Sequence, residues 1–296
     1  MIRGAALLVL IVSALTPAGA AQEPDRPVSR RTGRFQDSRI RESSGVVASR
    51  RHPGLLWTLN DSGGDPVLFF TDTTGAALGT YPVRGASNVD WEALGRGTCG
   101  DAVCLVIGDT GDNSERRSVV RLYRMVEPDT AAAARSGGGP PIESLGVGYP
   151  DGPHDVEALY VEPDGAVVLV TKGRRGGILT FRVSASAWGT GRATTAIRLD
   201  SLPMATSLST GRVVTDAAIS PDGQWVAVRT YRNVSFFRRD TAGRLHADPA
   251  RPVCDIAGLE PQGEGVDWWD QSTLVLTSER AGRSLGTIIL LRCPGP

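Results

Sequence analysis

A strand–turn–strand pattern recurs five times along the 296 residues of the chain. In each copy, a β-type run that opens with a small or acidic residue is followed by a turn and a second β-rich run. The five first runs are SSGVVAS from Ser43, DWEALGR from Asp90, DVEALYV from Asp155, TDAAISP from Thr215 and GEGVDWW from Gly263. A strand pair that returns every ~50 to 65 residues is typical of a β-propeller with one pair in each blade. The repeat therefore predicts an all-β fold with a single β-propeller of five blades.

The outer strands of the blades follow the repeats along the chain. The first four repeats are each followed by enough β-type sequence for a third and a fourth strand. The fifth is followed only by SLGTIILLRC. We expect GRFQDSRI, at residues 33–40, to supply the missing outer strand, because this pairing closes the ring and removes exposed sheet edges. Six blades are the alternative, if residues 127–153 or 184–210 contain an irregular blade.

The N-terminal residues have the features of an export signal. Arg3 precedes an apolar stretch over residues 5–15, and the small residues AGA at 18–20 form a cleavage site. We assign residues 1–20 to a signal peptide, 21–32 to a disordered leader rich in Pro and charge, and 33–296 to the propeller. The protein is therefore predicted to be secreted or periplasmic, without membrane insertion, and monomeric.

Four cysteines in an exported chain suggest two disulfide bonds. Cys99 and Cys104 flank a short turn between two predicted strands, so we expect them to form a local bond. Cys254 would then pair with Cys293 and hold the last blade. Four cysteines allow three pairings, and the local spacing favours this one. The four cysteines contain no C-x-x-C spacing, which argues against a metal site.

The same positions of the repeats carry polar and charged residues. In a propeller the first strand of every blade lines the central channel, so these residues should meet at one axis. The first runs open with Ser44, Glu92, Glu157, Asp216 and Glu264, and the second runs end with Asp61, Asp109, Lys172, Arg229 and Glu279.

Several converging carboxylates repel one another unless a cation or protons intervene. A hard divalent ion such as Ca²⁺ takes six to eight oxygen ligands, and the loops NDSGGD and GDTGDN add further acidic residues. We therefore predict a Ca²⁺ cofactor at the channel mouth, held by Asp61, Glu92, Asp109, Glu157 and Glu264. The alternative is that these carboxylates accept hydrogen bonds from backbone amides and have a structural role.

Basic residues follow the second strands of the third and fourth repeats. Lys172 and Arg229 are predicted to bind the anionic part of a substrate beside the metal and to take part in catalysis. Glu279 is predicted to bind substrate at the same mouth. His154 is a candidate acid or base. The alternative for Lys172 and Arg229 is salt bridging, with Glu157 as the partner of Lys172.

Six short motifs resemble those of a family of exported bacterial β-propellers, most of whose members are uncharacterised. These motifs are N-D-S-G at 60–63, N-V-D-W-E-x-L at 88–94, G-D-x-G-D-N at 108–113, D-x-E-A-L at 155–159, P-D-G at 221–223 and P-Q-G-E-x at 261–265. The D-x-E-A-L segment is also similar to strands of calcium-dependent phytase-like and esterase-like propellers. The resemblance implies a propeller over nearly the whole mature chain and, in part, calcium-dependent hydrolysis.

The formal net charge is zero, so no electrostatic argument supports nucleic-acid binding. The expected partner is a small anionic substrate or a protein ligand. We predict a hydrolase of phosphoesters or other esters with calcium at the channel mouth. The alternatives are a non-catalytic propeller that binds a protein or cell-wall ligand, and a lactonase-like Ca²⁺-dependent hydrolase.

Overall fold

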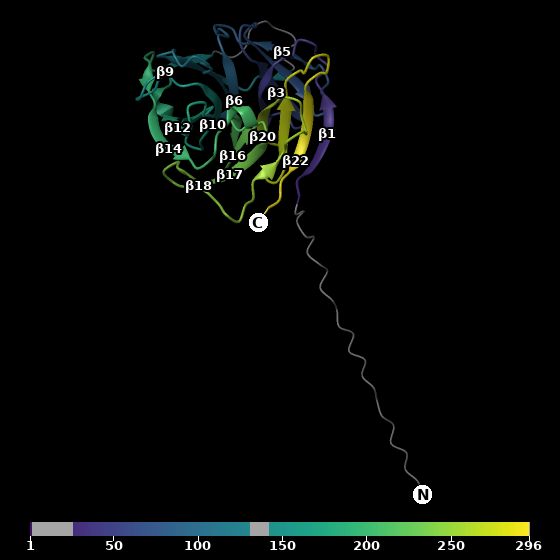
Figure 1. Cartoon of the computed structure of the whole chain (residues 1–296). Coiled ribbons are helices and arrows are strands. Elements are labelled where there is room, and N and C mark those ends of the chain that lie inside the picture. The colour runs from purple at the N-terminus through teal and green to yellow at the C-terminus, as the bar shows by residue number, and fades with distance from the viewer. Residues whose placement is uncertain (2–25, 131–141, 296) are drawn as a thin grey trace.

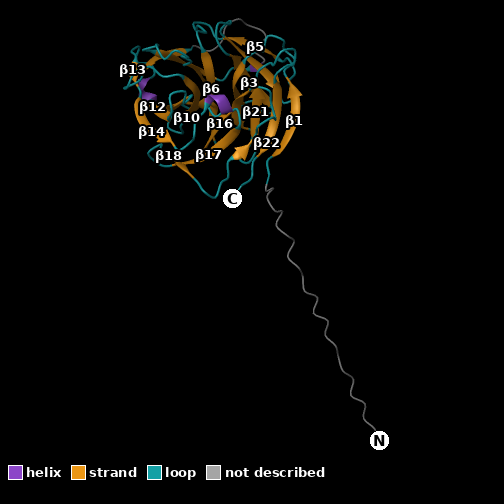
Figure 2. Cartoon of the chain, in the orientation of Figure 1, coloured by secondary structure: helices purple, strands orange, loops and turns teal. Residues whose placement is uncertain are grey.

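Five antiparallel sheets arranged around one axis make up the protein, as a computed structural model of the chain shows (Figures 1 and 2). The structure describes Met1 and residues 26–130 and 142–295. The predicted signal peptide after Met1, and residues 21–25 of the predicted leader, lie outside these ranges. The five-bladed prediction is confirmed. Both segments that could have held a sixth blade connect or extend the five sheets within the described ranges.

Each blade is a sheet whose strands run outwards from the axis in chain order, except that the outermost strand of blade five comes from the N-terminal part of the chain. Blade one contains β2 (Ser43–Ala48), β3 (Leu55–Asn60), β4 (Val67–Asp72) and β5 (Gly79–Pro82). Blade two contains β6 (Trp91–Cys99), β7 (Ala102–Asp109), β8 (Val120–Val126) and β9 (Glu143–Gly148). Blade three contains β10 (Val156–Val161), β11 (Val167–Thr171), β12 (Ile178–Val183) and β14 (Ile197–Leu202).

Blade four contains β15 (Val214–Ile219), β16 (Trp225–Thr230), β17 (Asn233–Arg239), and the two short strands β18 (Leu245–Ala247) and β19 (Cys254–Asp255), which both pair with β17. Blade five contains β20 (Gly263–Trp268), β21 (Leu274–Ser278), β22 (Thr287–Arg292) and β1 (Val28–Arg34). A short strand, β13 (Thr194–Thr195), leaves blade three and pairs in parallel with β9 of blade two. The 3₁₀ turns η1 (Ala185–Ala187) and η2 (Leu208–Thr210) lie in loops.

The N-terminal strand closes the ring, as predicted, but it begins earlier than expected. Figure 1 shows β1 beside β22, and the two pair from Val28 with Arg292 to Arg34 with Thr287. Residues 28–32, which we expected in a disordered leader, therefore belong to the last blade. Their charged side chains suit a strand that is exposed at the edge of the sheet. Pairing with β22 satisfies backbone groups on one side of β1.

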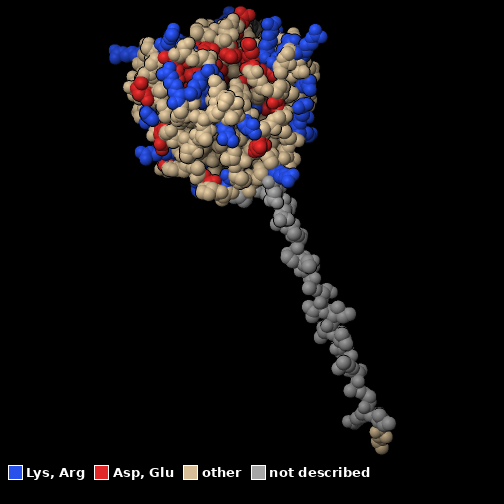
Figure 3. Space-filling view, viewed as in Figure 1, with Lys and Arg blue, Asp and Glu red and all other residues tan. Residues whose placement is uncertain are grey.

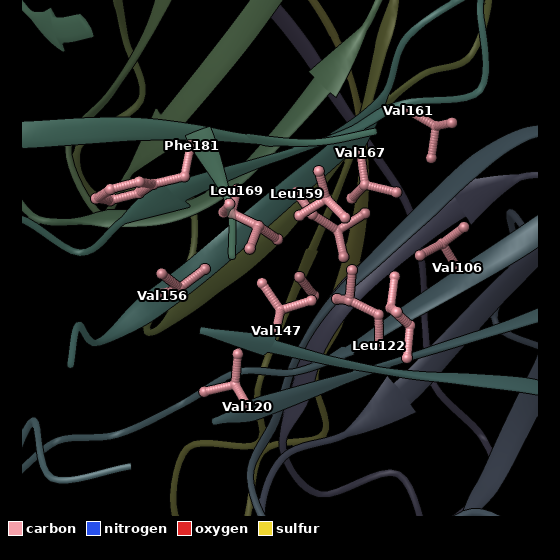
Figure 4. Packing of buried hydrophobic residues seen from close by; sticks show 14 of the residues in the cluster. Val106, Val120, Leu122, Val147, Val156, Leu159, Val161, Val167, Leu169 and Phe181 are labelled. Carbon is pink, nitrogen blue, oxygen red and sulfur yellow. The ribbon is translucent and has the colours of Figure 1, made fainter. Parts of the chain in front are cut away.

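The hydrophobic core is divided into five clusters, one between each pair of neighbouring blades. Figure 4 shows the cluster between blades two and three, which contains Val106 and Leu122 of blade two and Leu159 and Phe181 of blade three. Because a neighbour covers each face of a blade, β2, β10 and β20 are buried at every position. This explains why the first runs of the repeats lack a strict apolar–polar alternation.

Polar side chains also connect adjacent blades close to the axis. The hydroxyl of Ser44 donates to the carbonyl of Trp91 at 2.9 Å, and that of Thr110 donates to the carbonyl of Val156 at 2.9 Å. The Thr215 hydroxyl donates to the carbonyl of Glu264 at 3.0 Å. Each bond joins one blade to the next, so the relative positions of the inner strands are fixed.

Both predicted disulfide bonds are present, but the second does more than expected. Cys99 and Cys104 bridge the β6–β7 hairpin. Cys254 lies in β19 of blade four, whereas Cys293 follows β22 of blade five. The Cys254–Cys293 bond therefore joins the last two blades, rather than holding blade five alone. No helix of the described residues is long and apolar enough to cross a membrane.

Removing the bond between blades should destabilise the protein more than removing the hairpin bond. The two bonds join cysteines that are 39 and 5 residues apart. Loop-closure entropy then predicts losses of about 4 kcal/mol for Cys254→Ser with Cys293→Ser and about 2 kcal/mol for Cys99→Ser with Cys104→Ser. Urea denaturation of the two double variants measures both losses. Equal losses would show that restriction of the unfolded chain does not account for these bonds.

Candidate functional site

The starts of the inner strands meet at one end of the channel, which we call the acidic mouth and define by Asp61, Asp90, Glu92, Glu157 and Glu264. Glu92, Glu157 and Glu264 each occupy the second position of an inner strand, in β6, β10 and β20. Their exposed fractions are only 6%, 3% and 5%. Figure 3 shows acidic and basic side chains interspersed on the upper part of the face in view.

Three of these carboxylates form a compact group between blades one and two. Asp61 follows β3, Asp90 precedes β6, and Glu92 lies in β6; one carboxylate oxygen of each lies within 4.8 Å of the others. Gly111 lies against this group, because a Cβ atom there would come within 2.5 Å of Asp90 Oδ2 and 2.8 Å of Glu92 Cγ. Among the described residues, no hydrogen bond or ion pair ends on the Glu92 carboxylate. The group therefore has the donor chemistry of a site for a hard cation.

Burial and the charges of neighbouring acids raise the pKa values of Asp90, Glu92 and Glu157, and burial raises that of Glu264. Burial raises the pKa of Glu92 well above its usual range, and the negative charges of Glu157 and Asp61 raise it further. Burial, together with the charge and hydrogen bond of Asp61, raises the pKa of Asp90 to about 6. Burial raises the pKa of Glu264 to about 7. These groups retain protons at pH values where exposed carboxylates have lost them.

Lys172 is at the mouth but already has a partner. Its Nζ atom donates to Glu157 Oε1 at 2.6 Å, and the two side chains are 10% and 4% exposed. Burial lowers the pKa of Lys172, but the attraction of Glu157 outweighs this and leaves it above its usual value. The salt bridge that we considered as an alternative is thus present.

Arg229, which was predicted to bind an anionic substrate, makes contacts with its own and the next blade in the structure. Its side chain is 1% exposed and pairs with the buried carboxylate of Glu260. The Nη1 atom donates to the carbonyls of Gly265 at 2.6 Å and Thr277 at 3.1 Å. Arg229 therefore connects blade four to blade five, and its two terminal nitrogens are occupied.

The carboxylate of Asp109, a predicted metal ligand, is occupied by contacts with other groups. It pairs with Arg117 at 2.8 Å and accepts hydrogen bonds from the amides of Val89 and Asp90 at 3.3 and 3.2 Å. This is the structural role that we gave as the alternative for the acids. Asp109 positions the backbone of Asp90, but the compact group of carboxylates does not include it.

The corresponding position of blade four, Asp216, is fully buried and likewise has a structural role. It accepts hydrogen bonds from the amides of Ala217 and Val266, both at 2.8 Å. Burial raises its pKa well above the usual range, although both amide bonds oppose the shift.

His154 does not contact the acidic mouth. Its Nε2 atom is 2.8 Å from Asp151 Oδ1, and its ring packs against Tyr149 and Phe181 with centroids 5.3 and 5.0 Å away. Asp151 also contacts Arg198 of β14, the outermost strand of blade three. These contacts place His154 away from the axis.

Glu279 lies beside the mouth in blade five. Its carboxylate accepts a hydrogen bond from Gln262 at 2.6 Å. Burial, with the charges of Glu264 and Asp61, raises its pKa to about 8.

Two residues of the mouth were not identified from the sequence. Asp90 is two residues before Glu92, so strand periodicity could have indicated that both side chains share one side. Tyr231 follows β16, and its hydroxyl donates to Glu264 Oε1 at 2.9 Å. Burial and the Glu264 charge raise the pKa of Tyr231, so the hydroxyl stays protonated. No sequence pattern distinguished Tyr231 from an ordinary turn residue.

No known protein-family model matches the chain, and no curated protein matches its sequence. The PQQ-bound aldose sugar dehydrogenase from Streptomyces coelicolor is similar at 12% identity and a TM-score of 0.48, over 91% of this chain and 99% of that chain. Hydrazine synthase from Kuenenia stuttgartiensis is similar at 12% identity and a TM-score of 0.43, over 82% of this chain and 77% of that chain. The Dos1 propeller is similar at 10% identity and a TM-score of 0.39, over 80% of this chain and 52% of that chain. The fold assignment rests on the five sheets themselves, and these similarities say nothing about activity.

The raised pKa values predict that the metal-free protein loses stability as the pH rises. Carboxylates of the unfolded chain release their protons near pH 4. In the folded protein, Asp90, Glu264 and Glu279 hold theirs until about pH 6, 7 and 8. Between these values the folded state binds more protons than the unfolded state, so the free energy of unfolding falls as the pH rises from about 4 to about 8.

Urea denaturation of chelator-treated protein at a series of pH values measures this fall. Glu279→Gln should flatten the part of the curve that approaches about pH 8. Carboxyl groups with lowered pKa values, such as Asp72, change the free energy of unfolding only at lower pH, where they titrate. They therefore do not contribute between about pH 5 and pH 8. A free energy of unfolding that stays constant or rises above about pH 5 would contradict the assignment of protons to these acids.

Proposed function

We propose that the protein is a secreted or periplasmic β-propeller that binds Ca²⁺ at the acidic mouth and hydrolyses phosphoesters or other esters there. The observation that carries the proposal is the compact group of Asp61, Asp90 and Glu92, whose oxygens lie within 4.8 Å of one another. Backbone carbonyls and water would complete a coordination shell of six to eight oxygens. The two disulfide bonds support an oxidising compartment.

The electrostatics of the mouth support a cation in preference to a set of bare carboxylates. Glu92 is buried beside Glu157 and Asp61, and ionising all three without compensation is unfavourable. Protons provide compensation at low pH, and a divalent cation would provide it at neutral pH. The remaining acids have other partners, since Lys172 pairs with Glu157 and Tyr231 donates to Glu264.

Three groups beside the metal ligands could act on an ester. A bound calcium ion would polarise an ester oxygen and lower the pKa of a bound water. Lys172 is held by Glu157 and would attract the anionic part of a substrate. Glu264, with a pKa of about 7, can accept or return a proton near neutral pH. Arg229 and His154 have no part in this proposal, because their contacts hold them elsewhere.

One observation favours a second candidate, a non-catalytic propeller that binds a protein or cell-wall ligand. The two cations expected to hold an anionic substrate are both neutralised, Lys172 by Glu157 and Arg229 by Glu260. A mouth of this kind can bind a cation for stability without turning over an ester. A lactonase-like activity is a variant of the catalytic proposal, and the same panel of substrates tests it.

Calcium should raise the thermal midpoint of chelator-treated protein, because it binds the folded state. Glu92→Gln removes a ligand charge and should weaken calcium binding by more than about tenfold in calorimetry. Glu42→Gln is the matched control, since Glu42 is exposed and lies outside the compact group. An identical melting curve in chelator and in millimolar calcium would favour the structural role for all the acids.

A second pair of variants tests the position of the ligands without changing charge. Gly111→Ala should displace the Asp90 and Glu92 carboxylates and weaken calcium binding, because its Cβ would overlap them. Gly64→Ala is its control, since a Cβ there would meet nothing nearer than Asn88 Nδ2 at 4.0 Å. Equal affinities of the two variants would place the cation somewhere else.

Calcium-loaded protein should hydrolyse a member of a panel of phosphoesters, carboxylic esters and lactones. Lys172→Ala should then reduce kcat by about 10²–10³ if Lys172 stabilises charge in the transition state. Absence of turnover across the panel, with calcium binding intact, would establish the binding propeller as the better description. Turnover that survives Lys172→Ala would exclude Lys172 as an anion-binding residue.

A further inference from the structure

The channel ends in a second opening whose chemistry differs from that of the acidic mouth. The inner strands all start at the acidic mouth, so their far ends and the following loops meet at the opposite end. A pocket of about 580 Å³ lies there, lined by loops of blades one to four. We call it the second mouth and define it by Arg50, Arg96, Thr98, Val161 and Ile219.

The second mouth is a compartment separate from the acidic mouth. Between them, side chains of the inner strands leave a space of only about 10 Å³, lined by Gly95, Leu159, Ala217 and Ala218 among others. Such a space holds about one water molecule. A ligand at one end therefore cannot reach the other through the channel, and the two ends can be tested independently.

Two guanidinium groups lie at the second mouth, and in the described part of the chain only that of Arg96 forms an ion pair with a carboxylate. Arg96 pairs with Asp267 at 2.8 Å and donates to the carbonyl of Ala48 at 2.7 Å. Arg50 donates to the carbonyls of Trp268 and Trp269 at 3.0 and 3.1 Å. Burial lowers the pKa of Arg50, and the positive charge of Arg96 lowers it further. The arginines therefore repel one another, and an additional anion would relieve this repulsion.

The other acids that line the pocket already have partners. Glu162 is fully buried and accepts hydrogen bonds from Arg182 and Arg239. Asp222 accepts hydrogen bonds from Ser220 and Gln271. Glu162 is therefore compensated by its own two arginines, whereas the hydrogen bonds of Asp222 come from neutral side chains. Among the described residues, no ion pair joins either acid to Arg50 or Arg96.

The arginines retain donors for a ligand. A guanidinium has five N–H groups, and the hydrogen bonds above use two of each. The three that remain on each arginine can bind a carboxylate in the bidentate geometry that arginine favours. Val103, Val161, Pro163 and Ile219 form apolar walls around them. A pocket of this size, mostly apolar with a few converging polar groups, is typical of a small-molecule site.

We propose that the second mouth binds a small organic carboxylate with an apolar body, its carboxylate between Arg50 and Arg96 and its body against the apolar walls. This site is independent of the proposed calcium site. It requires neither a metal nor turnover at the acidic mouth.

Binding of 4-phenylbutyrate to the full chain in excess chelator tests the proposal. Calorimetry should show saturable binding of the acid at millimolar concentrations and much weaker binding of 4-phenylbutanol, which has the same body without the charge. Arg50→Gln should weaken binding of the acid by about tenfold or more. Arg51→Gln is the matched control, because Arg51 contacts Asp129 and the Glu127 carbonyl and does not line the pocket. Its affinity should equal that of the unchanged protein.

A second variant keeps the test decisive if Arg50→Gln impairs folding. Thr98 lines the pocket and is exposed, so Thr98→Trp fills the space while both arginines remain. It should abolish binding and leave the thermal midpoint unchanged. Equal binding of the acid and the alcohol, unchanged affinity in Thr98→Trp, or no saturable binding of the acid would each overturn the proposal.

Discussion

Close packing of five inner strands around one axis is the constraint on which the rest of the structure depends. The strands are buried on both faces, and their backbones approach so closely that some positions have no room for a side chain. A Cβ at Gly45 would lie 2.8 Å from the amide nitrogen of Leu94, and one at Gly265 would lie 3.0 Å from the amide nitrogen of Val46. Small residues along the axis therefore close the channel, and charged groups are restricted to its two ends.

The charges at the strand starts are compensated in different ways from blade to blade. Blade three uses a cation, since Lys172 pairs with Glu157, and blade four uses backbone amides, which bind Asp216. Blade five uses the Tyr231 hydroxyl, which binds Glu264. In blade two, Glu92 has no such partner among the residues that the structure describes, and its carboxylate lies close to those of Asp61 and Asp90. The candidate cation site therefore lies where the protein itself supplies the least compensation.

The sequence was sufficient for the fold because the fold depends on repetition. Five copies of one strand pair, with the same turn chemistry, predicted the blades, their outer strands and the closing strand. The bounds of that closing strand were wrong, because pairing with β22 makes a strand of residues 28–32 whatever their composition. Both disulfide bonds followed from local spacing, and the strand expected around residues 251–256, which contains Cys254, pairs with β17 of blade four.

The sequence predicted which side chains meet at the candidate site only where their position in an inner strand determines it. The alignment of repeats placed Glu92, Glu157 and Glu264 together, because all three occupy the second position of an inner strand. It could not separate Asp61 from Asp109, which stand at the ends of equivalent strands but have different contacts. Asp109 pairs with the Arg117 side chain and accepts hydrogen bonds from the amides of Val89 and Asp90. Nor could the alignment show that Arg229 crosses to Glu260 of the next blade. The charged partners of Asp109 and Arg229 lie in loops, whose sequences differ between the repeats, so aligning the repeats does not reveal these contacts.

The same packing places carboxylates at one end of the channel and arginines at the other. All inner strands run in one direction, so the second position of each strand reaches the acidic mouth, and the residues after each strand reach the other end. Acids at the first end are buried by neighbouring blades, whereas Arg50 and Arg96 at the second end emerge into a pocket bounded by loops. A change in one of these loops can alter the second mouth without disturbing the axis. The crowded strands thus isolate two sites whose chemistry can vary independently, each set by the short segments at its own end.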